Sequence, residues 1–265
     1  MEILGYSAAI LIGVSLGLIG GGGSILTVPV LVYLFDIHPS QATFYSLFIV
    51  GITSLAGAYS NYKKQQVSIS TTLLFGISSI ITVLLTRRLI VPAIPEYILS
   101  IGNWQLTKSF ATMLLFALLM IAAAISMIRT KDSQEQAGTC SNGKTAYGKL
   151  LLYGLLIGLV TGLLGAGGGF LLIPALVLLV KLPVKTAIGT SLAIIALNSL
   201  IGFTGDPGHY SIDWTLLIIL STLAIAGIIA GSYLGKKIDS SRLKQGFGWF
   251  VLAMGIVVIT IELMK

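Results

Sequence analysis

The sequence predicts an all-α polytopic membrane protein made of two inverted-topology repeats, each with about five apolar segments. Three observations support this prediction: a composition that is 55% hydrophobic and only 9% charged, apolar runs of membrane-spanning length, and an internal duplication. Soluble domains contain roughly 25% charged residues. With so few charges, this chain cannot build a surface that faces water on all sides.

Ten apolar segments follow one another, and a helix that crosses a bilayer core of ~30 Å needs about 20 such residues. They are expected at residues 3–19, 24–36, 40–60, 69–91 and 107–129, then at 149–164, 169–182, 185–205, 213–235 and 244–263. The first is expected to be a membrane segment rather than a secretory signal, because Glu2 replaces the basic start of a signal. A polar linker at 130–148 separates a first membrane repeat, 1–129, from a second, 149–265.

The two halves match at an offset of 145 residues, which places Gly17 over Gly162. This offset aligns GLIGGGGSILTVPVLV with GLLGAGGGFLLIPALV, and QATFYSL with TAIGTSL. Thirteen identical pairs occur over about forty positions, with glycines and a proline among them. Because shared hydrophobicity alone does not give such a match, the chain is interpreted as an internal duplication.

An odd number of segments in each repeat predicts that the two repeats are inverted relative to each other in the membrane. Cytoplasmic loops collect Lys and Arg, and with both termini outside, twelve basic residues lie inside and four outside. The inner residues are Lys63, Lys64, Arg129, Lys131, Lys144, Lys149, Lys181, Lys185, Lys236, Lys237, Arg242 and Lys244; the outer ones are Arg87, Arg88, Lys108 and Lys265. We therefore expect a multi-pass protein of the plasma (cell inner) membrane with extracytoplasmic termini and a cytoplasmic linker.

The second segment of each repeat is short, follows a glycine tract and contains a proline, Pro29 or Pro174. About 13 helical residues reach only ~20 Å, so these segments are either re-entrant or incomplete spans. Paired interruptions of this kind indicate the substrate site of a transporter. Glycine lets a ligand approach the backbone, and a helix N-terminus attracts anions. We expect the tracts to meet near mid-membrane and bind an anion; close helix packing is the alternative explanation.

The predicted substrate-binding residues come from the two tracts and from the third segment of each repeat. They are Gly20, Gly21, Gly22, Gly23, Ser24, Tyr45 and Ser46, with Gly165, Gly167, Gly168, Gly169, Thr190, Ser191 and Asn198; Thr27, Thr53 and Ser199 are further candidates. Any of the hydroxyls can instead bond to the carbonyl four residues back, whereas a buried Asn needs several partners. Every charged residue falls in a loop or near a segment end, so a site of neutral groups is expected. This argues against a metal carrier lined by carboxylates.

Other functions are disfavoured. Cys140 is the only cysteine, which excludes an internal disulfide and a thiolate metal cluster. His38 and His209 adjoin turn residues at predicted membrane edges, and a proton-coupling role for His38 beside Asp36 stays open. A serine hydrolase would need a buried base near Ser24, so no enzyme is expected. Scattered basic residues disfavour nucleic acid, and no cofactor or Walker motif is found.

The run GLLGAGGGFLLIPAL followed by TAIGTSL, residues 162–192, resembles the sulfite exporter TauE/SafE family, also called the 4-toluene sulfonate uptake permease family. The run GSYLGKKI, residues 231–238, is similar to a later glycine-rich signature of that family. The resemblance covers both halves. It implies a plasma-membrane carrier of sulfite, sulfoacetate or a related sulfur-containing or organic anion, coupled to an ion gradient.

The first half departs from the family pattern. It has GGGGS where GxGGGF is usual, FYSL in place of GTSL, and Thr82 and Thr86 where the second half has Gly227 and Gly231. These changes adjoin the predicted site, so they leave the identity of the substrate open. The sequence thus predicts a secondary transporter of a small anion that works by alternating access, coupled to protons or sodium, with homo-oligomer formation left open. An anion channel of the same architecture is the alternative.

Overall fold

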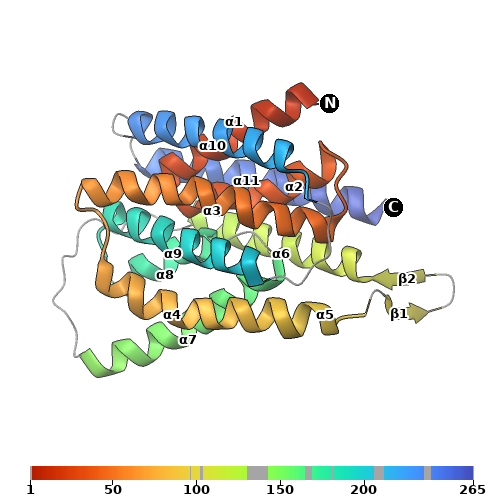
Figure 1. Cartoon of the computed structure of the whole chain (residues 1–265), viewed down its shortest axis with the longest axis horizontal. Coiled ribbons are helices and arrows are strands. Elements are labelled where there is room, and N and C mark those ends of the chain that lie inside the picture. The colour runs from red at the N-terminus through yellow and green to blue at the C-terminus, as the bar shows by residue number, and fades with distance from the viewer. Residues whose placement is uncertain are drawn as a thin grey trace.

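The computed structural model describes residues 2–95, 97–101, 104–129, 143–164, 169–178, 180, 182–205, 212–235 and 240–264. Nearly all of the described residues are helical, and they form one bundle of roughly aligned helices (Figure 1). Four helical stretches among them are long and apolar enough to cross a membrane: Pro39–Lys63, Ile69–Ala93, Lys185–Gly205 and Trp214–Leu234. Shorter apolar helical stretches accompany them, among them Gly23–Tyr33, which falls in the segment predicted to be an incomplete span.

The helices follow the predicted segments closely. The first half contains α1 (Glu2–Ile19), the 3-10 helix η1 (Gly21–Leu26), α2 (Thr27–Tyr33), α3 (Pro39–Lys63), α4 (Ile69–Leu85), the π-helical turn η2 (Thr86–Ile90), α5 (Val91–Ala93) and α6 (Lys108–Arg129). The second half contains α7 (Gly143–Leu164), α8 (Gly169–Leu178), α9 (Val184–Gly205), α10 (Trp214–Leu234) and α11 (Ser240–Leu263). α7 begins six residues before the apolar run that was predicted to start at residue 149.

Two short antiparallel strands, β1 (Tyr97–Ile101) and β2 (Trp104–Thr107), join α5 to α6 and were not predicted. Their pairing places Ile101 opposite Trp104. Aromatic and branched residues on both sides of a glycine favour such a hairpin. The hairpin extends from one end of the bundle, where both chain termini also lie (Figure 1); we call this the hairpin end.

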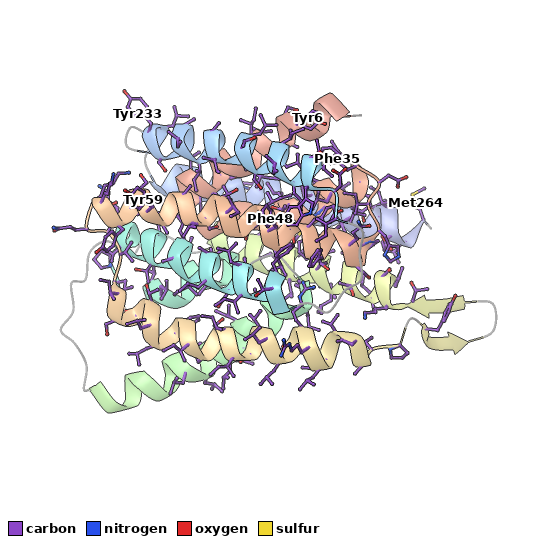
Figure 2. All side chains as sticks on the ribbon, viewed as in Figure 1. Tyr6, Phe35, Phe48, Tyr59, Tyr233 and Met264 are labelled. Carbon is purple, nitrogen blue, oxygen red and sulfur yellow. The ribbon has the colours of Figure 1, made fainter. Side chains whose placement is uncertain are left out.

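Labelled aromatic residues mark the two ends of the bundle. Figure 2 shows Tyr6, Phe35 and Met264 at the hairpin end and Tyr59 and Tyr233 at the opposite end. Tyr6, Tyr59 and Tyr233 belong to three different helices, α1, α3 and α10. Tyrosine is enriched where a membrane protein meets the lipid–water interface, so the two ends are consistent with two membrane faces.

Helices at duplicate positions run in opposite directions. The last turn of α3 lies against the first turns of α9, because a methyl group on Gly189 would meet Asn61. Farther along, Gly51 lies against Leu200 and Gly202 lies against Leu47. α3 and α9 are therefore antiparallel, although the 145-residue offset makes them copies of each other.

The contacts among the other helices also match between the two halves. α1 packs on α10 while α7 packs on α4, and α3 contacts α10 while α9 contacts α4. Each of these contacts thus has a counterpart formed by the duplicate helices. This is the packing expected when two copies of one unit associate about a two-fold axis.

Glycine seams join the outer helices to the bundle. A methyl group on Gly13 would overlap the Ala224 carbonyl, and one on Gly231 would overlap the Val14 carbonyl, so α1 and α10 approach backbone to backbone. In the other half Gly158 packs on Ser79 and Thr82. Small residues allow such close approach between membrane helices, and the packing interpretation of the four-residue glycine spacing holds here.

The first two segments fold back on each other as a helical hairpin. α1 begins at the hairpin end, and the chain returns there after α2, where the Phe35 ring lies 5.8 Å from the Tyr6 ring. Gly5 leaves room for the same phenyl ring. Between these points the chain reverses at Gly20, the only described residue of the tract with a positive φ. The glycine tract is therefore the tip of an inserted loop.

Candidate functional site

The two glycine tracts meet inside the bundle. The backbones of Gly21 and Gly169 are in direct contact, since a methyl group added to either would overlap the main chain of the other. The contact lies against α9, whose Ile195 side chain also packs on Gly169. Gly165, Gly167 and Gly168 lie outside the described residues. The glycines that the structure describes therefore serve close helix packing and also bring the two tracts together.

The neighbouring glycines have distinct structural roles. Gly20 adopts φ 76° and ψ −125° at the start of η1, a conformation that L-residues with a side chain rarely adopt. It lies beside the Ser191 hydroxyl. Gly23 faces the other way, toward the Ile12 carbonyl of α1. Gly22 lies between Gly20 and Gly23 in the chain. The η1 turn is therefore contacted by α9 on one side and by α1 on the other.

Most hydroxyls predicted to bind substrate donate to their own helix. Ser24 Oγ donates to the Gly21 carbonyl at 2.7 Å. Ser46 donates to Thr43 O at 2.9 Å, and its duplicate Ser191 donates to Ile188 O at 2.8 Å. In this conformation each hydroxyl proton is used, so these oxygens present lone pairs rather than donors to an incoming anion.

Asn198 joins two helices near the crossing of α3 and α9. Its Nδ2 donates to Ser79 Oγ of α4 at 2.6 Å, and both residues are fully buried. Within the described part of the chain, its Oδ1 has no hydrogen-bond partner. Thr53 occupies the duplicate position and donates to Ile49 O at 2.6 Å. A buried amide with one open acceptor can hold water or a ligand donor.

The hydroxyls of Thr27 and Ser199 are also buried, and neither has a partner among the described residues. Thr27 is the first residue of α2, directly after η1. Ser199 follows Asn198 on α9. Neither hydroxyl donates to another described residue.

Two of the predicted substrate-binding residues form hydrogen bonds with other helices. The Tyr45 hydroxyl accepts from Asp213 N at 2.8 Å and from Gln41 Nε2 at 3.0 Å, which ties α3 to the start of α10. Thr190 Oγ1 accepts from Ser68 N at 2.9 Å, which ties α9 to the start of α4. The contacts that the structure shows for both residues are links between helices rather than contacts with the glycine tracts.

Two charged residues that lie near segment ends are buried. Asp36, His38 and Lys185 are exposed, as expected. Arg87 is only 2% exposed within η2, and Glu262 is 6% exposed on α11. The sequence carried a signal for the first of these, because the apolar run continues beyond Arg87 and keeps it inside a helix that ends at Ala93.

A bundle of long apolar helices defines a polytopic membrane protein, and the interior contact between Gly21 and the first residue of α8, Gly169, is an arrangement typical of transporters. The chain belongs to the sulfite exporter TauE/SafE family, whose model matches residues 6–258.

Curated relatives extend the comparison. A probable membrane transporter protein of Xylella fastidiosa (strain 9a5c) is 30% identical over 252 residues, which cover 94% of this chain and 91% of the relative. A probable membrane transporter protein of Bacillus subtilis (strain 168), YdhB, is 26% identical over 231 residues, 86% of each chain. One of Haemophilus influenzae Rd is 24% identical over 272 residues, 93% of each chain. No solved structure matches. The chain is thus a multi-pass membrane protein of a transporter family.

Proposed function

We propose that this protein is a secondary transporter of a small anion, such as sulfite, sulfoacetate or a related sulfur-containing or organic anion. It works in the plasma membrane by alternating access of two inverted repeats, driven by a proton or sodium gradient. The observation that carries the proposal is the buried backbone contact between Gly21 and Gly169. Membership in a family of sulfite exporters supports the substrate class.

The arrangement suits alternating access because the duplicate helices α3 and α9 cross antiparallel beside the glycine contact. A two-fold related pair of units can exchange their conformations, and the exchange turns an outward opening into an inward one. The Gly21–Gly169 contact then acts as a barrier between the two openings. Separation of the tracts on one side would admit the anion.

Binding is assigned to the backbone amides of Gly21 to Ser24 and of Gly165 to Gly169, because the Gly20 amide already donates to the Leu16 carbonyl at 2.9 Å. The first amides of a helix lack partners within the helix and carry the positive end of its dipole. Thr27, Asn198 and Ser199 complete the site with buried polar groups. An anion held in this way needs no charged residue at the contact itself, which keeps the cost of crossing the membrane low.

A channel of the same architecture is the second candidate. A channel needs a continuous water path, whereas the direct backbone contact between the two tracts closes this route. That favours a carrier. Flux separates the two, since a carrier saturates and exchanges one substrate for another, while a pore does neither.

The test uses the purified full-length protein in liposomes. Uptake of sulfite, sulfoacetate, sulfate, thiosulfate and small carboxylates is measured with and without a pH or sodium gradient. We expect saturable uptake of at least one sulfur oxyanion, stimulated by unlabelled anion trapped inside the vesicles. Flux that rises linearly with concentration and shows no counterflow would support the channel. Absence of flux for every anion would refute the proposal.

A further inference from the structure

A surface groove of about 190 Å³ lies between α3 and α10, at the end of the bundle opposite to the hairpin. Its lining comes from the last two turns of both helices and from Lys64, the residue that caps α3. Figure 2 shows Tyr233, which also lines the groove, at that end of the bundle. On the same measure, one water needs about 10–15 Å³. The groove therefore has room for a ligand much larger than water.

The lining changes from apolar to basic along the groove. Gly57 and Ile229 form the part farther from the helix ends, the hydroxyl residues Ser60 and Ser232 come next, and the exposed Lys64 stands last. Gly57 and Lys64 are seven residues apart on one helix, which is about 10 Å. The headgroup layer of one leaflet is roughly 5–8 Å deep. The groove therefore crosses that layer and reaches the first part of the acyl chains.

The surroundings of the groove are those of a helix end at a membrane face. The side chains of Ile229 and Tyr233 are exposed, and so is Tyr59 on the neighbouring part of α3. Lys63 Nζ lies 4.6 Å from the centre of the Tyr59 ring. Tyrosine and lysine near helix ends anchor a membrane protein at the level of the lipid headgroups. The basic rim of the groove is therefore expected at that level.

The charge of the groove favours an anionic partner. Among the described residues that line it, Lys64 is basic and none is acidic. Lysines at a membrane face attract anionic lipid headgroups. A zwitterionic headgroup carries an ammonium group of its own beside the phosphate, and this group opposes the approach of Lys64. An anionic phospholipid therefore matches the groove better than a zwitterionic one.

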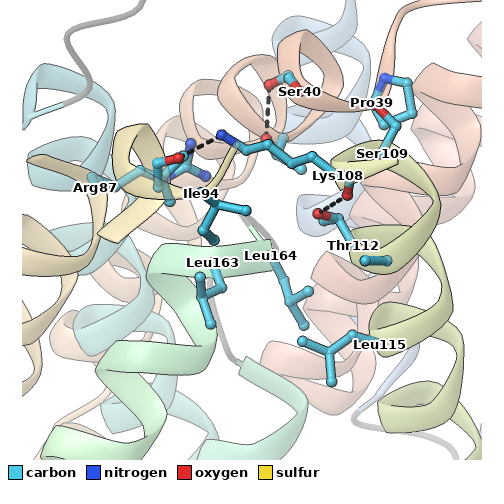
Figure 3. Close-up of a pocket in the computed structure, with 13 residues that line it drawn as sticks. Pro39, Ser40, Arg87, Ile94, Lys108, Ser109, Thr112, Leu115, Leu163 and Leu164 are labelled. Carbon is cyan, nitrogen blue, oxygen red and sulfur yellow. Dashed lines mark hydrogen bonds between the residues drawn. The ribbon is translucent and has the colours of Figure 1, made fainter. Parts of the chain in front are cut away.

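The duplicate helices are packed differently at the hairpin end. Arg87 corresponds to Ser232 across the 145-residue offset, but it is buried and lines another cavity, together with residues of α6 and α7 (Figure 3). Leu84 and Gly205, which also correspond to residues of the groove, pack on each other. The lysine-edged groove is therefore a property of one membrane face.

A second copy of the chain is a less suitable occupant. In a two-fold dimer the same surface patch meets itself, so the Lys64 side chains of both copies would enter one interface. Like charges repel more strongly in such an interface than in water. The change from apolar to basic along the groove instead follows the order of acyl chain, glycerol and phosphate in one phospholipid.

We propose that this groove binds an anionic phospholipid of the leaflet at this end of the bundle. The headgroup phosphate lies at Lys64, the hydroxyls of Ser60 and Ser232 face the phosphate and glycerol oxygens, and an acyl chain lies along Gly57 and Ile229. The lipid contacts α3 of the first repeat and α10 of the second, and so it stabilises their association. This inference goes beyond anion transport and does not depend on it.

Lipid retention tests the proposal on the full-length protein in a non-ionic detergent. Native mass spectrometry is recorded with phosphatidylglycerol and with phosphatidylcholine of the same acyl chains. We expect preferential retention of one phosphatidylglycerol, and about fivefold weaker binding in Lys64→Gln, the usual effect of one lysine at a membrane face. The matched control is Lys63→Gln, because Lys63 is the next residue, is exposed and lies over Tyr59. Unchanged retention in Lys64→Gln, or an equal loss in both variants, would overturn the proposal.

A second variant tests the shape of the groove without changing its charge. Ala56→Leu fills the groove from α3, and we expect it to lose the lipid while its elution profile stays that of the wild type. Phosphatidylglycerol should also raise Tm of the wild type more than that of either Lys64→Gln or Ala56→Leu. Full retention in Ala56→Leu would place the lipid elsewhere. A lipid-free dimer that Ala56→Leu dissociates would assign the groove to a second copy instead.

The outcomes also separate this inference from the proposed function, because lipid retention requires no flux. A protein that retains phosphatidylglycerol through Lys64 but moves no anion would preserve the lipid site and refute transport. An active transporter whose Lys64→Gln variant retains the lipid as the wild type does would refute the site and preserve transport.

Discussion

Gly21 and Gly169 touch through their backbones, and each occupies the space that a side chain of the other would need. They belong to the two copies of one duplicated unit, and they bring the first glycine tract against the start of α8. An added methyl group cannot be accommodated by a rotamer change here, because the atoms that it would meet belong to the main chain.

Gly21→Ala is expected to abolish anion flux and to lower the free energy of unfolding by about 1–3 kcal/mol, the usual cost of an overpacked interior. Flux in liposomes and thermal unfolding in detergent measure the two effects. The matched control is Gly76→Ala, because a methyl group on this buried helical glycine would meet only Leu197 Cδ1, at 4.0 Å. Normal flux in Gly21→Ala would show that the contact is not part of the transport path.

Ser79→Ala is expected to destabilise the protein by about 1–3 kcal/mol, since it leaves the buried Asn198 amide without its partner. Replacing both residues, as in Ser79→Ala with Asn198→Leu, should cost less than the sum of the two single changes. A double-mutant cycle on thermal unfolding measures the coupling. Additive effects would contradict a direct hydrogen bond between α4 and α9.

Gly227→Leu is expected to separate α10 from α1, because a methyl group there would already overlap the Ile10 carbonyl. Membrane helices held by small residues lose their contact when a large side chain is inserted. The amount of folded protein after detergent extraction is the measurement. Gly235→Ala, at the end of the same helix with its nearest neighbour at 3.3 Å, serves as the mild control. Equal yields for both variants would argue against close packing of α10 on α1 at Gly227.

The predicted orientation can be tested with single cysteines. The native Cys140 lies in the predicted cytoplasmic linker. Met264→Cys, made in a Cys140→Ser background, places a thiol at the hairpin end on a residue that is 82% exposed. A maleimide that cannot cross membranes should label Met264→Cys from outside the cell, and Cys140 only after lysis. Labelling of both from the same side would refute the orientation.

The sequence by itself determined the membrane class, the duplication and the approximate positions of the helices. Low charge and long apolar runs leave a chain few alternatives to membrane helices, and the repeated glycine tracts reveal two copies of one unit. The short second segments could be recognised from Pro29 and Pro174, whose positions match across the offset. These features are local or periodic, so they are visible along the chain.

Only the tertiary structure decided which groups meet. The sequence did not tell how the first two segments are arranged, and the Tyr6–Phe35 contact shows that they fold back on each other. It placed Arg87 near the outer end of the segment 69–91, and only the structure shows that this side chain is buried, beside a cavity that residues of α6 and α7 also line. Burial depends on neighbours distant in sequence, and local hydropathy does not encode them. For the same reason, spacing along the chain did not reveal that Tyr45 and Thr190 link helices.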